Sequence, residues 1–167
     1  MEFKAWFQCI NPECRSKYEL TDIIYRCKEC NELLEVQHDM ELLKQLGPVE
    51  WKALFKDRVG RHEWPYASSV WGKKEWVCPN LENKNVVSTL EGGTNLFWAE
   101  RLGSQIGLDD LWIKQCGMAH TGSFKDLGMT VLVSMVKQMI SEGKKIRAVA
   151  CASTGDTSAA LAAYCAV

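Results

Sequence analysis

The chain has 167 residues and a formal net charge of −1, from 20 basic and 21 acidic side chains. Because the two signs are interspersed, the sequence lacks the basic stretch that is typical of nucleic-acid binding. No apolar run reaches the length of a membrane span, and residues 1–10 lack the core of a signal peptide. We therefore expect a cytoplasmic protein without nucleic-acid or membrane partners.

Four of the eight cysteines lie in two close pairs near the N-terminus. The order is Cys9-x4-Cys14, twelve residues, then Cys27-x2-Cys30. This spacing fits four thiolates around one structural zinc ion, although x4 is less specific than x2. Two disulfides are the alternative, which the lack of a secretion signal disfavours. We expect a zinc-ribbon-like module over residues 1–37. Its predicted strands are 17–20, 23–26 and 33–36, and Cys151 and Cys165 are expected in a core.

A helical and tryptophan-rich segment is predicted over residues 38–90. Asp39 is placed to cap a first helix, Gly47 breaks it, and Pro48 suits the first turn of a second helix. The tryptophans are expected to pack as core aromatics between the ribbon and a sheet. They are Trp51, Trp64, Trp71, Trp76 and Trp98.

The start of an α/β domain is predicted over residues 91–167. A helix capped by Thr94 or Asn95 is expected over 96–106, strands over 110–116 and 146–153, and a further helix after each strand. This order predicts a right-handed βαβ unit, with both intervening loops at the carboxyl ends of parallel strands. Ligands of open α/β sheets bind at that edge.

Lys125 lies where a polar, glycine-bearing loop meets an apolar helix. Ser123 and Asp126 have the spacing of a capping box, which places Lys125 in the first helical turn. The positive end of the helix and partial burial both favour a neutral amine, and a neutral amine can form a Schiff base. The alternative is a first-turn lysine that bends out to solvent, as most single lysines do.

A second loop of small hydroxyl residues, 153–158, precedes an alanine-rich helix from about Ala159. Backbone N–H groups and hydroxyls at a helix N-terminus suit an anion such as a carboxylate or a phosphate. Serine and threonine are also ordinary helix caps, and Asp156 can serve as one. The residue types alone leave both interpretations open.

Three ordered motifs, at residues 91–96, 120–126 and 152–160, resemble those of fold-type II pyridoxal-phosphate enzymes. Within that group the chain is most similar to the plant-type branch of the threonine synthase family, and the tryptophan-rich stretch 64–77 agrees with it. The resemblance covers the chain from about Tyr25. It implies an α/β fold with a parallel sheet flanked by helices, pyridoxal 5'-phosphate as cofactor, and a homodimer.

The resemblance also implies roles for individual residues. Lys125 would attach to the cofactor and then move protons at the substrate carbons, while Phe124 and Asp156 would contact the cofactor. Asp156 stands where many relatives have asparagine, although the plant-type branch favours aspartate. The substrate carboxylate would be bound by Ser153, Thr154, Gly155 and Thr157. The implied reaction, that of a carbon-oxygen lyase acting on phosphates, converts O-phospho-L-homoserine and water to L-threonine and phosphate.

Alternatives remain at this stage. Cysteate synthase and threonine dehydratase share motifs with the chain, and a zinc-ribbon binding module is the alternative from another class. Residues 158–167 stop inside a helix without a C-terminal cap. A phosphate-binding loop and a partner for the pyridine nitrogen have no counterpart. We therefore expect an N-terminal fragment that is inactive by itself.

Overall fold

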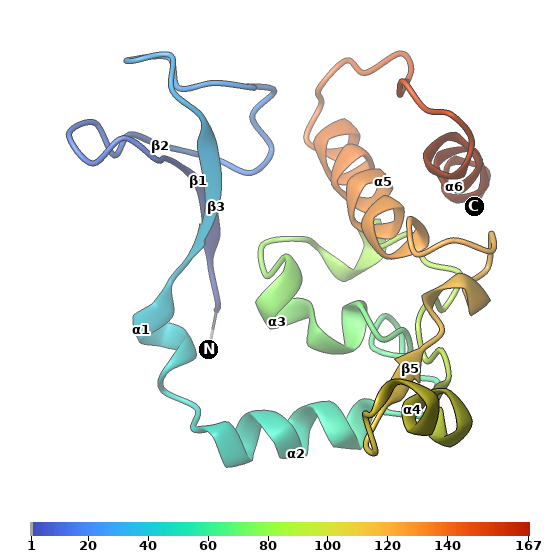
Figure 1. Ribbon diagram of the computed structural model, residues 1–167. Helices are drawn as coiled ribbons and strands as arrows, with labels where there is room; N and C mark the ends of the chain where they lie inside the picture. The colour runs from blue at the N-terminus through green and yellow to red at the C-terminus, as the bar shows by residue number, and fades with distance from the viewer. Residues whose placement is uncertain (1) are drawn as a thin grey trace.

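The structure, a computed structural model, describes residues 2–167 (Figure 1). Its strands are β1 (Ala5–Cys9), β2 (Lys17–Tyr18), β3 (Leu34–His38), β4 (Leu96–Trp98) and β5 (Trp112–Lys114). Its α-helices are α1 (Met40–Leu43), α2 (Pro48–Arg58), α3 (Lys74–Val77), α4 (Glu100–Ile106), α5 (Asp126–Ser141) and α6 (Asp156–Cys165). Three short 3-10 helices are η1 (Trp71–Lys73), η2 (Asn83–Asn85) and η3 (Cys116–Met118). The predicted mixture of helices and strands is therefore present.

The N-terminal strands form an antiparallel sheet in the order β2-β1-β3, in which Phe7 lies opposite both Tyr18 and Val36. The sequence prediction missed β1. It also placed a strand at residues 23–26, which is wrong, because the amide of Ile24 bonds locally to the carbonyl of Asp22 and not to a neighbouring strand. Strand formation depends on such a ladder partner, which local residue preference does not reveal.

The helices after the ribbon begin where the sequence predicts. The Asp39 carboxylate accepts a hydrogen bond from the Leu42 amide at 3.1 Å and caps α1. Gly47 separates the two helices, and Pro48 occupies the first turn of α2. Trp51 on α2 is buried and stacks against Phe55, with ring centroids 5.4 Å apart.

The largest apolar core surrounds Trp71, which is fully buried in η1. Leu81 and Val86 join it from the same segment, and Ala5 and Leu20 join it from the ribbon. The expectation that the tryptophans are core aromatics holds for Trp51 and Trp71. It is wrong for Trp64, Trp76 and Trp98, each of which is about half exposed at 47–50%.

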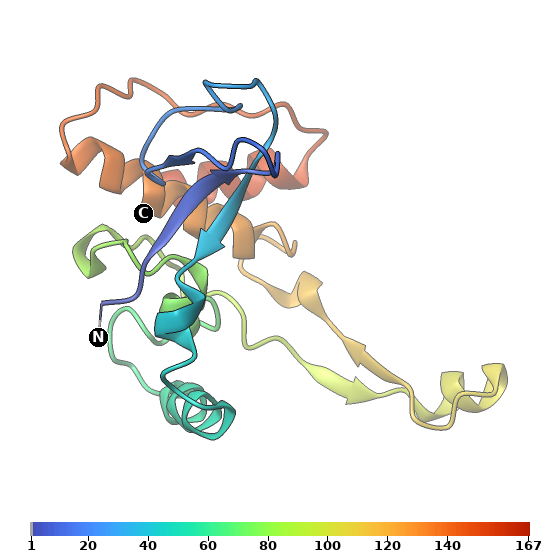
Figure 2. The same ribbon diagram turned by 90° about the vertical axis from the view of Figure 1, so that its left-hand side faces the viewer.

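The segment β4-α4-β5 extends away from the other elements as an arm (Figure 2). Its strands pair antiparallel, with Phe97 opposite Ile113. The predicted helix over 96–106 is wrong in its first part, because residues 96–98 pair with β5 and the helix begins at Glu100. The predicted parallel sheet and βαβ unit are also wrong for residues 2–167, where both sheets are antiparallel.

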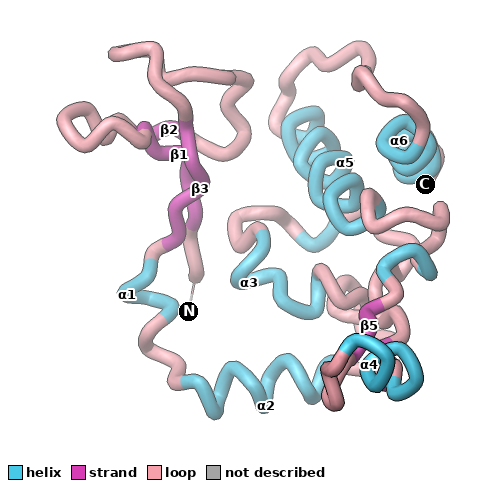
Figure 3. The backbone as a smooth tube through the Cα atoms, viewed as in Figure 1, coloured by secondary structure: helices cyan, strands magenta, loops and turns pink. Residues whose placement is uncertain are grey.

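Helices α5 and α6 pack against each other through Val133, Leu161 and Tyr164. The connection between them is irregular over 144–155 (Figure 3), so the predicted strand at 146–153 is wrong. Its apolar residues meet no ladder partner in the described chain, and only Ile146 and Val149 are half-buried. Cys151 in this connection and Cys165 at the end of α6 were predicted to be core residues. This prediction is wrong, since both are exposed.

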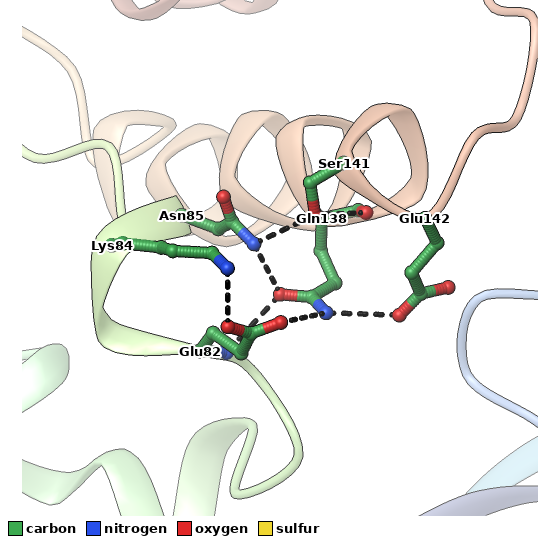
Figure 4. A network of polar contacts seen from close by, with 6 residues as sticks. All are labelled: Glu82, Lys84, Asn85, Gln138, Ser141 and Glu142. Carbon is green, nitrogen blue, oxygen red and sulfur yellow. Dashed lines mark hydrogen bonds and ion pairs between the residues drawn. The ribbon is translucent and has the colours of Figure 1, made fainter.

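The second half of α5 is tied to η2 by a polar network around Gln138 (Figure 4). The Gln138 side-chain oxygen accepts hydrogen bonds from Asn85 at 2.7 Å and from the Glu82 amide at 3.1 Å. Its nitrogen donates to Glu142 at 2.9 Å. Because Gln138 is 5% exposed and both ends of its amide are satisfied, the network fixes α5 against the core.

Candidate functional site

The lysine loop, residues 119–125, is closed by the carboxylate of Asp126. This fully buried group accepts hydrogen bonds from the Thr121 amide at 2.8 Å and from the Thr121 hydroxyl at 2.5 Å. The predicted capping box between Ser123 and Asp126 is therefore wrong. The helix α5 begins at Asp126, with Lys125 in the N-cap position just before it.

The Lys125 side chain is half-buried, and its ammonium lies 4.2 Å from the centroid of the Phe124 ring. This distance is that of a cation-π contact. The Phe124 ring itself is 56% exposed. Lys125 therefore presents its amine at the edge of the loop, beside an accessible aromatic surface.

Lys125 and the hydroxyl loop line one hollow of about 690 Å³. The lining residues are Lys125, Ala152, Ser153, Thr154, Gly155, Asp156 and Thr157. The starts of α5 and α6 both border it, since Lys125 and Gly155 are their N-cap residues. Helix N-termini carry partial positive charge, so the hollow suits an anionic group. The structure thus brings together all the residues predicted to contact the cofactor or the substrate except Phe124, which contacts Lys125 but does not line the hollow.

Ser123 connects the two loops and was not among the predicted site residues. It is 6% exposed, and its hydroxyl donates to the Asp156 carboxylate at 3.1 Å. The same oxygen accepts the Lys125 amide at 3.3 Å. One buried hydroxyl therefore holds both the backbone of the lysine and the carboxylate of the second loop.

Ser153 orders the start of α6. Its hydroxyl accepts hydrogen bonds from the amides of Gly155 at 3.1 Å and Ser158 at 3.2 Å. The Ser158 hydroxyl donates to the Gly155 carbonyl at 2.7 Å. Ser153 thus supports the first turn of α6, whose N-cap residue is Gly155, and its proposed contact with a substrate carboxylate stays a prediction.

The motif at 91–96 holds α6 through a hydrogen bond between Glu91 and Tyr164. The Glu91 carboxylate is 3% exposed and accepts hydrogen bonds from Ser88 at 2.9 Å and from the Tyr164 hydroxyl at 3.0 Å. Burial raises the pKa of Tyr164, so its hydroxyl stays protonated and can donate. Gly92 has φ 94°, and an added Cβ would lie 1.5 Å from the Ser69 oxygen. This position therefore requires glycine.

The four N-terminal cysteines form a compact cluster. Their sulfur atoms all lie within 4.8 Å of one another, with Cys9 and Cys30 3.4 Å apart and Cys14 and Cys27 3.6 Å apart. Tetrahedral ligation with zinc-sulfur bonds of about 2.3 Å requires sulfur atoms about 3.8 Å apart. The observed separations match this geometry and exceed the length of a disulfide bond.

The backbone around the cluster supplies hydrogen-bond donors to sulfur. The amide of Asn11 points to Cys9, that of Glu29 to Cys27 and that of Glu32 to Cys30. Two hydroxyls add to these: Tyr18 lies 3.3 Å from the sulfur of Cys27, and Ser16 lies 3.2 Å from that of Cys14. Burial raises the pKa of Cys9 to about 12, whereas the Tyr18 hydrogen bond lowers that of Cys27 to about 6. This donor set suits thiolates that share one cation.

None of the helices within residues 2–167 is both long and apolar enough to cross a lipid bilayer.

Residues 87–167 match the family described as pyridoxal-phosphate dependent enzyme. This part of the chain contains Lys125 and the hydroxyl loop, and the match agrees with the resemblance that its motifs indicated.

Over nearly its whole length the chain is homologous to threonine synthases. It is 53% identical to threonine synthase 2, chloroplastic, of Arabidopsis thaliana over 93% of the chain and 30% of that protein. It is 38% identical to the threonine synthase of Methanocaldococcus jannaschii, over 94% of the chain and 34% of the relative. It is also 38% identical to a threonine synthase of Methanosarcina acetivorans, over 94% of the chain and 33% of that relative. The chain thus spans about a third of the length of these relatives.

Proposed function

We propose that the chain is the cofactor-lysine part of a threonine synthase, which converts O-phospho-L-homoserine and water to L-threonine and phosphate. One observation carries the proposal: the Lys125 amine and the hydroxyl loop line the same hollow, within a segment of the pyridoxal-phosphate enzyme family. The homology over the preceding residues favours threonine synthase over cysteate synthase or threonine dehydratase.

The residues of the hollow fit pyridoxal phosphate. Lys125 offers a primary amine for its covalent attachment, and Phe124 offers an apolar face next to that amine. When bound, the cofactor supplies an electron sink for charge that develops on the substrate carbons. Asp156, held by Ser123, is the polar group from the second loop that would contact the cofactor.

The chain's own residues then have two tasks. The first is binding, for which the hydroxyls of Thr154 and Thr157 and the positive start of α6 suit the substrate carboxylate. The second is proton transfer. The Lys125 amine lies on a flexible side chain, so its nitrogen can accept a proton from one substrate carbon and return it at the next.

The test compares Lys125→Ala with Lys137→Ala, which removes an exposed lysine from the same helix. On the natural protein, Lys125→Ala is expected to abolish both the absorbance band of the bound cofactor and phosphate release from O-phosphohomoserine. Lys137→Ala is expected to keep both. Retention of the band in Lys125→Ala would remove the lysine from its role.

We also propose that Cys9, Cys14, Cys27 and Cys30 hold one structural zinc ion. Among the described ribbon residues, Ala5 and Leu20 join the main core and the partly buried Phe7 packs against it, so the ribbon has little apolar burial of its own. A small module of this kind gains its stability from metal ligation. The cytoplasmic location and the homodimer are further proposals, which rest on composition and on the family resemblance.

A further inference from the structure

We propose that Tyr18 is a positioning residue of the cysteine cluster, whose hydroxyl donates a hydrogen bond to Cys27 and thereby strengthens zinc binding. The inference rests on the proposed zinc site and goes beyond it, because it assigns part of the affinity to a residue that does not touch the metal. Its basis is the geometry of two hydrogen bonds at one phenolic oxygen.

The direction of these hydrogen bonds follows from the chemistry of the partners. The Tyr18 oxygen lies 2.9 Å from the amide nitrogen of Lys28 and 3.3 Å from the sulfur of Cys27. An amide N–H can only donate, so it occupies a lone pair of the phenolic oxygen. A metal-bound cysteine is a thiolate and can only accept. The O–H of Tyr18 is therefore the donor to Cys27.

Tyr18 is held in place by the ribbon. It lies on β2 directly opposite Phe7 of β1, the strand that ends at Cys9. Lys28, the residue after Cys27, places its ammonium 5.7 Å from the centroid of the Tyr18 ring. Because strand pairing and the Lys28 amide both fix the phenol, little reorganisation is needed when a metal binds.

Cys27 is a buried ligand, at which such a donor has a large effect. It is 3% exposed, so water contributes little to the solvation of its sulfur. Four thiolates around one divalent ion leave a net charge of about −2, which hydrogen bonds to sulfur must offset inside the protein. The amides of Glu29 and Cys30 also point to Cys27, but they belong to the turn that carries the ligand. Tyr18 donates from a separate element, the strand β2.

The experiment measures zinc affinity of the chain by competition with a chromophoric chelator, for the wild type, Tyr18→Phe and Tyr25→Phe. Tyr25 is a matched control because it lies in the same module and is 88% exposed. Loss of a metal-site hydrogen bond of this kind weakens metal binding about 10- to 100-fold. We expect that loss in Tyr18→Phe and a change of less than about twofold in Tyr25→Phe, where no such hydrogen bond is removed.

Each outcome decides a different statement. If the wild type binds no zinc, the zinc proposal fails and this inference fails with it. If the wild type and Tyr18→Phe bind zinc equally tightly, the zinc site stands and only the role of Tyr18 is overturned. Far-UV circular dichroism of zinc-saturated Tyr18→Phe is expected to match the wild type. A variant that stays unfolded at saturating zinc also overturns the inference, because Tyr18 would then be needed for the fold itself.

Discussion

The hydroxyl of Thr130 joins two parts of the buried core, and its removal gives a quantitative test of the structure. Thr130 lies on α5 and is completely buried. Its oxygen accepts the indole N–H of Trp71 at 2.8 Å and donates to the carbonyl of Val87 at 2.7 Å. Thr130→Val keeps the shape of the side chain and removes both hydrogen bonds.

The expected loss of unfolding free energy depends on the hydrogen bonds that Trp71 and Val87 keep in the variant. The Trp71 indole is fully buried and loses its hydrogen-bond acceptor, so an unsatisfied donor remains in the core. The Val87 carbonyl keeps only a weak, shared contact with the Ser134 hydroxyl at 3.3 Å, because that hydroxyl also donates to the Thr130 carbonyl at 2.6 Å. An unsatisfied buried donor costs about 1–3 kcal/mol and a lost hydrogen bond about 1 kcal/mol, so we expect about 2–4 kcal/mol.

Urea unfolding at 25 °C, followed by circular dichroism, measures this loss as a lower midpoint with an unchanged slope. Thr154→Val is the matched control, because it makes the same chemical change at an exposed position, where effects stay within about 0.5 kcal/mol. In a Trp71→Phe background, Thr130→Val should cost less, since the indole N–H is already gone. Equal midpoints for Thr130→Val and the control would refute the reasoning.

Three further predictions concern the segments on either side of this core. Arg58 and Glu75 form a two-point ion pair, with hydrogen bonds of 2.7 and 2.8 Å, and their side chains are only 13% and 16% exposed. Arg58→Ala should therefore lower the free energy of unfolding by about 3 kcal/mol, measured by urea titration. The control Arg61→Ala, at an exposed ion pair, should change it little. Burial opposes ionisation of Glu75, but hydrogen bonds from Arg58 outweigh it and lower its pKa below 4.5. The stability that ionised Glu75 contributes is therefore fully present above pH 4.5 and is lost as the pH falls through the lower pKa of the folded state. The urea midpoint of Glu75→Gln should therefore depend less on pH in that range than the midpoint of the wild type. Gly92→Ala should destabilise the protein more than Gly60→Ala. Both glycines have positive φ, but only at Gly92 would the added Cβ clash with a neighbouring side chain, that of Ser69. Equal melting temperatures of the two variants would contradict this prediction.

Features that depend on neighbouring residues could be predicted from the sequence. The Asp39 cap, Pro48 at the start of α2 and the long apolar face of α5 involve contacts within a few positions, and the structure has all three. Residues 96–98 and 146–153 were mispredicted, because their conformation depends on whether a distant segment pairs with them. Residue preference does not contain that information.

The candidate site shows the same division. The order of the two loops predicted that Lys125 and residues 153–157 lie together, and they do, although packing of α5 on α6 and not a parallel sheet brings them there. Ser123 was interpreted as part of a capping box because Asp126 follows it three positions later. Its actual partner, Asp156, lies 33 residues away, and only the folded chain places the two side chains in contact.

The ribbon and Lys125 are connected through one continuous set of contacts. Ala5 and Leu20 of the ribbon pack into the same core as Trp71, whose indole bonds to Thr130 on α5. Lys144, just after α5, adds an ion pair to Asp22 of the ribbon at 3.7 Å. Lys125 stands at the N-cap of that helix, so the ribbon supports the element that positions the amine. The ribbon therefore contributes to the candidate site by keeping one face of this core covered with Ala5 and Leu20.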